Sequence, residues 1–286
     1  MAFRLVKSPY AAAEQDLAAS STLRAFAVLD QIAASDEALT LEGLTRLSGL
    51  PKPTVHRILH LLMRGGLVER QSHDKRYVVG PRTCALALAV QMRSPRRRER
   101  RAILSRLVET IGETCNFTML DGNEVVYLER VETSADVRLH MEAGSRVPLH
   151  CTASGKLLLS DMTLAQVRRL LGNGPLPRYT ERTIAHLPTL ERELAKIRAT
   201  RVGTDVGEYL VGSVCLAVPV HDAQGRMCAA VAVHGPAPRM TLKKGHSFLP
   251  AMRRAADEVA ATLSQGSVDA EPSRSSKYAS AGGIAA

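Results

Sequence analysis

Two closely spaced prolines, Pro51 and Pro53, constrain how this chain can fold more tightly than any other feature. Proline lacks an amide hydrogen, so a helix tolerates it only in the first turn, where amide groups have no intrahelical partner. We therefore expect a helix that starts near Pro51, runs to about Arg64 and ends at a pair of glycines. Its apolar residues recur at helical spacing and form one buried stripe: Val55, Ile58, Leu59 and Leu62.

Two further helices are expected before this one. Residues 22–34 carry apolar side chains at helical spacing, and residues 41–48 follow Thr40, a residue type that often caps a helix N-terminus. The shorter helix then has an apolar face made of Leu41, Leu44 and Leu47. The three helices match the order of a helix–turn–helix motif with its supporting helix.

A pair of short strands is expected after the third helix. Residues 67–70 and 76–79 contain β-forming side chains and flank the polar tip 71–75. A strand pair in this position forms a wing, and a basic tip would bring it to the neighbouring DNA groove or backbone. We assign residues 20–82 to a winged helix–turn–helix domain that is mainly α-helical with a β-wing.

The side chains outside the buried stripe favour DNA binding. A recognition helix offers the side chains near its N-terminus to base edges, while its first turn approaches phosphate groups. The candidates are Lys52, Pro53, Thr54, His56, Arg57 and His60 on the helix, Lys75 and Arg76 on the wing, and Arg24 on the supporting helix. Arg24 is equally compatible with a plain surface role. The alternative for the whole domain is a protein-docking module that has no specific DNA site.

Positive charge is concentrated in the same part of the chain. Residues 20–101 hold 15 Lys and Arg against 7 Asp and Glu, whereas residues 102–264 hold 19 against 17. The net charge of +10 is therefore carried mainly by the segment with the helix–turn–helix pattern. Such a localised excess is the electrostatic footprint of a nucleic-acid binder, and double-stranded DNA is the expected partner.

Composition excludes several other classes of protein. A length of 286 residues suits two domains that each bury a core. No apolar run approaches the roughly 20 residues of a membrane span, and the N-terminus lacks the apolar core of a signal peptide, so we expect a cytoplasmic protein. The five cysteines show no short metal-binding spacing, and no nucleotide-binding glycine motif is present; we expect neither metal nor cofactor. Residues 1–19 and 266–286 are expected to be a disordered leader and tail.

Residues 83–101 are assigned to a linker helix and a basic joint between two domains. Pro81 is well placed to open the helix, and Leu86, Leu88 and Met92 repeat at helical spacing after it. Residues 94–95, Ser-Pro, are expected to break the helix. The arginine-rich run 96–101 is typical of a solvated helix face or a joint, and its direct contact with DNA is left open.

After residue 102 the pattern changes to hairpins mixed with helices. An amphipathic helix precedes a hairpin at 116–120 and 124–130, whose turn is Asp121-Gly122-Asn123. Further strands are expected at 137–142, 203–205, 214–221 and 226–234, and helices after residue 152 and at 164–171, 190–200 and 248–263. A hairpin-built sheet covered by helices is an α+β domain, which we assign to residues 102–265.

Several blocks of the sequence resemble one known family. GLPKPTVHRILHLLMRGGLVER, followed by RYVVGPR, resembles the winged helix–turn–helix of IclR-type bacterial transcriptional regulators. PLHCTASGKLLLS, GEYLVGSVCLAVPV and AAVAVHGP resemble that family's effector-binding domain, and the blocks keep the family's order from about residue 20 to 265. The resemblance implies a repressor or activator that binds an operator, forms a homodimer or a dimer of dimers, and senses a small organic acid, carboxylic or aromatic, in a GAF-like domain.

The resemblance also implies where the small molecule binds. Leu139 and Val147 would form walls, with the backbone of Ala153 and Ser154 at the entry of a helix. The opposite side would be lined by Asp205, Cys215, Ala232 and His234. Relatives that bind small acids carry serines where Ala232 and His234 stand, so a larger or differently charged ligand is also compatible.

From the residues alone, only the helix entry at 152–155 stands out as a ligand site. Free amide groups at a helix N-terminus favour an anion. Cys215 is more typical of a buried strand than of a ligand contact, and Asp205 is also typical of a cap or of an ion pair with an arginine. His234 is equally typical of a ligand contact and of a structural hydrogen bond.

Cys151 with His150 or His140, together with Asp205, has the residue types of a nucleophilic triad. The spacing of these residues does not require such an arrangement. We expect no enzymatic activity.

Overall fold

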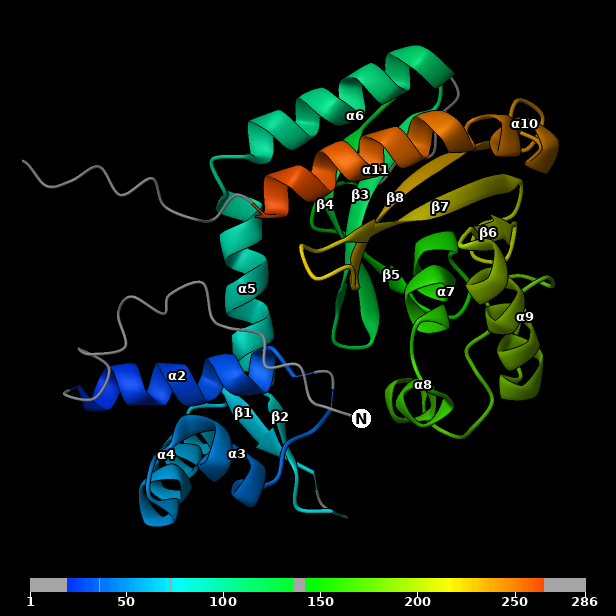
Figure 1. Ribbon diagram of the computed structural model, residues 1–286. Helices are drawn as coiled ribbons and strands as arrows, with labels where there is room; N and C mark the ends of the chain where they lie inside the picture. The colour runs from blue at the N-terminus through cyan, green and yellow to red at the C-terminus, as the bar shows by residue number, and fades with distance from the viewer. Residues whose placement is uncertain (1–19, 36, 72–73, 136–141, 265–286) are drawn as a thin grey trace, which may run out of the picture.

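The computed structural model describes residues 20–35, 37–71, 74–135 and 142–264, which form an N-terminal helical domain, a connecting helix and a larger α+β domain (Figure 1). Two sheets lie within these described ranges. One has two strands, β1 and β2, and the other has six strands in the order β5-β4-β3-β8-β7-β6. The predicted leader, residues 1–19, and the predicted tail, residues 266–286, lie outside the described residues.

The N-terminal domain has the predicted order of elements. They are α2 (Ser21–Ala33), α3 (Leu41–Ser48), α4 (Lys52–Arg64), β1 (Val68–Arg70) and β2 (Tyr77–Val79). Thr40 caps α3 by accepting a hydrogen bond from the Gly43 amide at 3.0 Å, and α3 ends at Gly49 with a left-handed φ of 66°. Pro53 lies in the first turn of α4, as its missing amide hydrogen requires. The core of the domain includes the fully buried Val28, Leu44, Val55 and Leu59.

The connection to the second domain differs from the prediction. It consists of α5 (Pro81–Arg93) and α6 (Arg97–Ile111). The basic run 96–101 is therefore not a joint but forms mostly the first turns of α6. The predicted boundary at residue 102 falls inside that helix. The cause is the buried carboxylate of Glu129, which accepts hydrogen bonds from Arg97 Nε at 3.0 and 3.1 Å. Arg100 is fully buried beside it and donates to the Gln91 carbonyl at 2.8 Å.

The second domain is built on an antiparallel sheet. Its strands are β3 (Thr114–Asp121), β4 (Glu124–Val131), β5 (Arg146–Pro148), β6 (Gly203–Val206), β7 (Ser213–His221) and β8 (Met227–Pro236). Its remaining helices are α7 (Ala153–Ser160), α8 (Leu164–Leu171), α9 (Leu187–Thr200), α10 (Leu242–Ser247) and α11 (Leu249–Ser264). In Figure 1, α6 and α11 lie side by side over one face of the sheet, while α7 lies on the other face with α9 beyond it.

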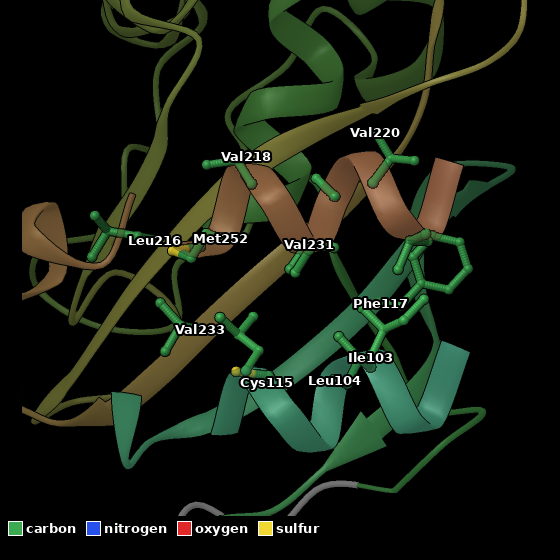
Figure 2. Packing of buried hydrophobic residues seen from close by; sticks show 14 of the residues in the cluster. Ile103, Leu104, Cys115, Phe117, Leu216, Val218, Val220, Val231, Val233 and Met252 are labelled. Carbon is green, nitrogen blue, oxygen red and sulfur yellow. The ribbon is translucent and has the colours of Figure 1, made fainter. Parts of the chain in front are cut away.

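The larger core lies between the sheet and the pair α6–α11. Figure 2 shows side chains from both helices meeting alternate residues of three central strands. The labelled residues are Ile103 and Leu104 of α6, Met252 of α11, Cys115 and Phe117 of β3, Leu216, Val218 and Val220 of β7, and Val231 and Val233 of β8. Because one face of β7 and β8 is filled by this core, residues at the intervening positions face α7.

Two short elements were not predicted, and one predicted strand cannot be compared. Strand β5 and helix α10 have three and six residues, too few to show a hydrophobic period. Of the strand expected at 137–142, residues 137–141 lie outside the described residues, and Glu142 is described but belongs to no strand. The predicted hairpins of β3–β4 and β7–β8 are confirmed.

Candidate functional site

Helix α4 presents most of the predicted DNA-binding side chains on one exposed face. Lys52, His56 and His60 follow one another at four-residue spacing, which places them in one row. Pro53 and Arg57 form the adjacent row, and all five are exposed. The opposite side of the helix is buried against α2 and α3, and Thr54 is half-buried between the two sides.

Lys52, the two basic wing residues and Arg24 differ in the contacts that their side chains make within the domain. Lys52 Nζ lies 2.8 Å from Glu42 Oε1, an ion pair between exposed side chains of α4 and α3. Arg76 is half-buried and donates to the Ala38 carbonyl at 3.1 Å, so its guanidinium is tied to the body of the domain. Lys75 is exposed at the wing tip in a left-handed conformation, φ 58°. Arg24 lies half-buried on α2.

A second site is a pocket between the sheet and α7. Seven of the eight predicted ligand-site residues line it: Val147, Ala153, Ser154, Asp205, Cys215, Ala232 and His234. The eighth, Leu139, lies outside the described residues. The lining also includes Thr152, from the helix entry 152–155 that the residues alone indicated, and six residues that were missed: Asn116, Tyr127, Tyr209, Leu210, Ser213 and Val233. The geometry thus brings together groups from widely separated parts of the chain.

Strand register explains why these residues meet. Asp205 pairs with Cys215, and Cys215 pairs with His234, which gives one row across β6, β7 and β8. Asn116 of β3 pairs with Ala232, two residues before His234 on the same face. This register of β3 against β8 is the signal that places Asn116 in the pocket, and it becomes readable only once those two strands are known to be neighbours.

Helix α7 closes the pocket with its N-terminus. Thr152 caps the helix, accepting a hydrogen bond from the Gly155 amide at 3.2 Å and donating its own hydroxyl to the Pro148 carbonyl at 2.7 Å. Ala153 and Ser154 begin the helix at the pocket wall. The first amide groups of a helix lie at the positive end of its dipole and favour negative charge at this end of the pocket.

The pocket is narrow in this conformation. Its cavity volume is about 30 Å³, which is room for one or two water molecules. One wall is formed by Tyr209 and Leu210, in a loop flanked by Gly207 and Gly212, whose φ values are 71° and 76°. A ligand of more than a few atoms therefore requires a wall residue to move.

Burial controls the ionisation of the pocket side chains. Burial and the neighbouring Arg130 guanidinium lower the pKa of His234 to about 3, so its imidazole is neutral. Burial raises the pKa of Asp205 to about 6, although the Glu208 amide donates to its Oδ1 at 2.7 Å. Burial also raises the pKa of the Cys215 thiol well above its ordinary value. The pocket thus contains one titratable carboxyl, a neutral imidazole and an un-ionised thiol.

A buried ion pair lies directly behind the pocket. Lys156 of α7 is fully buried and its ammonium group contacts the Glu208 carboxylate, with Glu193 Oε1 at 3.8 Å. Burial outweighs the lysine and raises the pKa of Glu208. The pair ties α7 to the residue next to Tyr209.

The nucleophilic triad considered from sequence does not assemble from the described residues. Burial raises the pKa of the Cys151 thiol to about 12, and His150 Nε2 donates to the Pro177 carbonyl at 2.8 Å. His140 lies outside the described residues. Nothing in this geometry generates a thiolate nucleophile at neutral pH.

None of the described helices is both long and apolar enough to cross a membrane.

Both domains of the chain match models of known protein families. Residues 92–261 match the model described as the bacterial transcriptional regulator IclR C-terminal domain, and residues 21–72 match the IclR helix-turn-helix domain. The chain is 45% identical over 244 residues to the probable transcriptional regulator SauR of Cupriavidus necator, an alignment that covers 85% of this chain and 97% of that protein.

Solved structures agree with the sequence comparison. The crystal structure of Thermotoga maritima IclR matches with a TM-score of 0.56 and 28% identity, covering 85% of this chain and 98% of that one. An IclR homolog from Microbacterium hydrocarbonoxydans, complexed with 4-hydroxybenzoate, matches with a TM-score of 0.53 and 25% identity, covering 85% and 99%.

Proposed function

Since this chain belongs to the IclR family of bacterial transcriptional regulators, with a helix–turn–helix DNA-binding domain and a C-terminal effector domain, we propose that it binds its operator through α4 and the wing and responds to a small organic acid bound in the pocket under α7. The observation that carries the proposal is that one chain contains both a candidate DNA-binding surface and a candidate ligand pocket. An exposed basic helix face lies in one domain, and a pocket with convergent polar groups lies in the other.

The DNA half of the proposal rests on α4. His56, Arg57 and His60 lie exposed on the side of the helix that faces away from the domain core. We propose that these residues, with Lys52, Pro53 and Thr54, contact bases and phosphates, that Lys75 and Arg76 do so from the wing, and that Arg24 contacts phosphate from α2. An arginine near the start of a recognition helix is well suited to reading guanine through two parallel hydrogen bonds.

Arg57→Ala is expected to weaken operator binding by about 1–3 kcal/mol, because a bidentate contact to guanine is lost. Fluorescence anisotropy on operator and scrambled duplexes measures the effect. Arg64→Ala, at the C-terminal end of the same helix, is the matched control, since it removes one exposed charge and should weaken binding to both duplexes alike. Unchanged operator affinity in a folded Arg57→Ala variant would remove this residue from the interface.

The effector half of the proposal rests on the pocket and on one relative. A homologous chain holds 4-hydroxybenzoate, a carboxylic and aromatic acid. Here, Ala153 and Ser154 at a helix start, with Asn116 and His234, offer groups that suit a carboxylate. Occupancy would widen the narrow pocket and shift the placement of the DNA-binding domains. Titration of small carboxylic and aromatic acids into the protein–operator complex tests this, and an operator affinity that no acid changes would count against it.

We propose that the protein acts as a homodimer, or as a dimer of dimers, with α5 in the contact between copies. None of the residues of α5 is buried, and Leu86 and Val90, one turn apart, are 58% and 59% exposed. On α2, Phe26 is 55% exposed. A second copy would remove this apolar surface from water and place two α4 helices on two half-sites.

The double variant Leu86→Glu/Val90→Glu is expected to sediment as a monomer and to lose most operator affinity, because only one half-site remains contacted. Analytical ultracentrifugation measures the mass. Leu164→Glu, an exposed apolar residue on α8, serves as the control and should leave the assembly intact. A monomeric wild-type protein that still binds its operator would refute the dimer.

A further inference from the structure

We propose that Arg130 sets the ligand specificity of the pocket by fixing Asn116 and His234 as hydrogen-bond donors, so that the site selects an oxyanion that also carries a hydroxyl or amino group for Asp205. The inference rests on the proposed effector function of this pocket. Arg130 lies outside the pocket wall, yet it determines which atoms of the wall donate hydrogen bonds.

The geometry around Arg130 is a buried polar cluster. Arg130 lies on β4 and is 6% exposed. Its Nη1 donates to Asn116 Oδ1 at 3.0 Å, and both Nη1 and Nη2 lie 3.4 Å from His234 Nε2. Its Nε donates to Glu132 Oε1 at 3.2 Å, and this carboxylate balances the guanidinium charge.

A guanidinium group can only donate hydrogen bonds, and this determines the roles of its two neighbours. The carbonyl oxygen of Asn116 accepts from Arg130, so the amide nitrogen of Asn116 is the group left for other partners. Nε2 of His234 must accept, so the ring is neutral and carries its proton on Nδ1. The lowered pKa of His234 agrees with a neutral ring.

Both remaining donors belong to residues that line the pocket and are almost completely buried. Asn116 is 1% exposed and His234 is 4% exposed. Among the described residues, the side-chain hydrogen bonds of Asn116 and His234 run from Arg130 to Asn116 Oδ1 and His234 Nε2. Asn116 Nδ2 and His234 Nδ1 are therefore the donors that these two residues offer to a ligand in the pocket, and a bound group with two acceptor oxygens could accept from both. A carboxylate, sulfonate or phosphonate has this form.

Asp205, at the other end of the same strand row, favours a different group on the ligand. Asp205 is 2% exposed and has oxygens that accept hydrogen bonds. The row Asp205, Cys215, His234 spans three neighbouring strands, so the two wall groups belong to strands roughly 10 Å apart. A short molecule with an oxyanion at one end and a hydroxyl or amino group at the other reaches both. An acid without the second group would offer Asp205 no hydrogen bond beyond those from its own protein neighbours, such as the Glu208 amide.

The first test needs no ligand. Long-range proton–nitrogen NMR correlation reports which ring nitrogen of His234 carries the proton. The wild-type protein is expected to show neutral His234 protonated on Nδ1 at pH 6, and Arg130→Met is expected to shift the proton toward Nε2. Arg146→Met, which removes an exposed arginine from the same domain, should leave the signal unchanged. A cationic His234, or one protonated on Nε2 in the wild type, would overturn the proposal.

The second test measures selectivity by isothermal titration with matched probes. Glycolate is compared with acetate, 4-hydroxybenzoate with benzoate, and each hydroxy acid with its amide. The wild type is expected to prefer at least one hydroxy acid by about tenfold or more over both analogues, since a hydrogen bond to a charged group is lost in each. Asn116→Asp keeps the acceptor for Arg130 but removes the donor, and should bind that acid about tenfold more weakly.

Arg130→Met should discriminate poorly between acid and amide, while Arg146→Met should match the wild type. Equal discrimination in Arg130→Met and wild type, or binding of no probe by the wild type, would overturn the proposed ligand class. An acid that releases operator DNA yet binds Arg130→Met as well as wild type would leave the effector function standing and sink only the role of Arg130.

Discussion

Lys156→Met is expected to lower the free energy of unfolding by about 3–5 kcal/mol, because it leaves a buried carboxylate without its counter-charge. The Lys156 side chain is fully buried against Glu208, and one oxygen of Glu208 is buried with no hydrogen-bond partner among the described residues. Removing the ammonium group takes away the main interaction that keeps Glu208 ionised. Chemical denaturation followed by circular dichroism measures the loss.

The matched control for this variant is Lys196→Met. Lys196 is 75% exposed and pairs with Glu193 at 3.4 Å, and an exposed pair of this kind contributes little. Adding Glu208→Gln to Lys156→Met should restore much of the stability, since the unpaired charge is gone. A Lys156→Met protein as stable as Lys196→Met would show that the buried pair contributes nothing.

The sign of the pH dependence follows from the raised pKa of Glu208. A carboxyl group whose folded-state pKa is raised favours folding at low pH, below its unfolded pKa, and loses that contribution as the pH rises through the folded value. The deficit of Lys156→Met relative to wild type should therefore be smallest near pH 4 to 5 and largest above neutrality. A deficit that grows on acidification would contradict this assignment.

Gly155→Ala is expected to destabilise the C-terminal domain by about 3 kcal/mol or more, beyond the usual cost of overpacking, because the clash is with backbone. An added Cβ would lie 2.3 Å from the Leu149 carbonyl oxygen and 2.5 Å from Leu149 Cα. The start of α7 would have to move away from the chain before it, and the pocket wall at Ala153 and Ser154 would move with it. The melting temperature and effector affinity should both fall.

Gly174→Ala provides the comparison for Gly155→Ala. A Cβ at residue 174 meets nothing within 4 Å, and that glycine has no left-handed φ. Its replacement should be neutral or slightly stabilising, through the entropy of the unfolded chain. A Gly155→Ala protein with the melting temperature of Gly174→Ala would mean that the start of α7 does not pack tightly against the Leu149 backbone.

Local patterns predicted most of the N-terminal domain and the hairpins. Pro51 and Pro53 restricted the start of α4, and the apolar spacing of Val55, Ile58 and Leu62 fixed its buried side. The arginine-rich run 96–101 did not mark the domain boundary. Arginines in sequence are expected to be exposed to solvent, but this holds only where no acidic side chain packs against them. Glu129, about 30 residues later, supplies that acidic side chain and draws Arg97 and Arg100 into a helix.

The pocket was partly predictable. Most of its residues were predicted from the resemblance to a family, and few from the local sequence pattern. Asp205, Cys215 and His234 do lie together, but nothing local marks Asn116 as their neighbour. Its position depends on pairing between β3 and β8, which are more than 100 residues apart in sequence. Arg130 was missed for the same reason, since a polar residue near a strand end usually faces solvent, whereas here it contacts Asn116 and His234.

Sequence-selective DNA binding is the central claim, and fluorescence anisotropy tests it most directly. Purified protein is titrated with the DNA upstream of its own gene and with a scrambled duplex of equal length, at two salt concentrations. We expect tight binding to the upstream DNA alone, and this binding should weaken steeply with salt, with a log–log slope near the number of phosphates neutralised. No binding to either duplex, or weak binding that ignores both sequence and salt, would contradict it and favour a winged domain that docks protein partners.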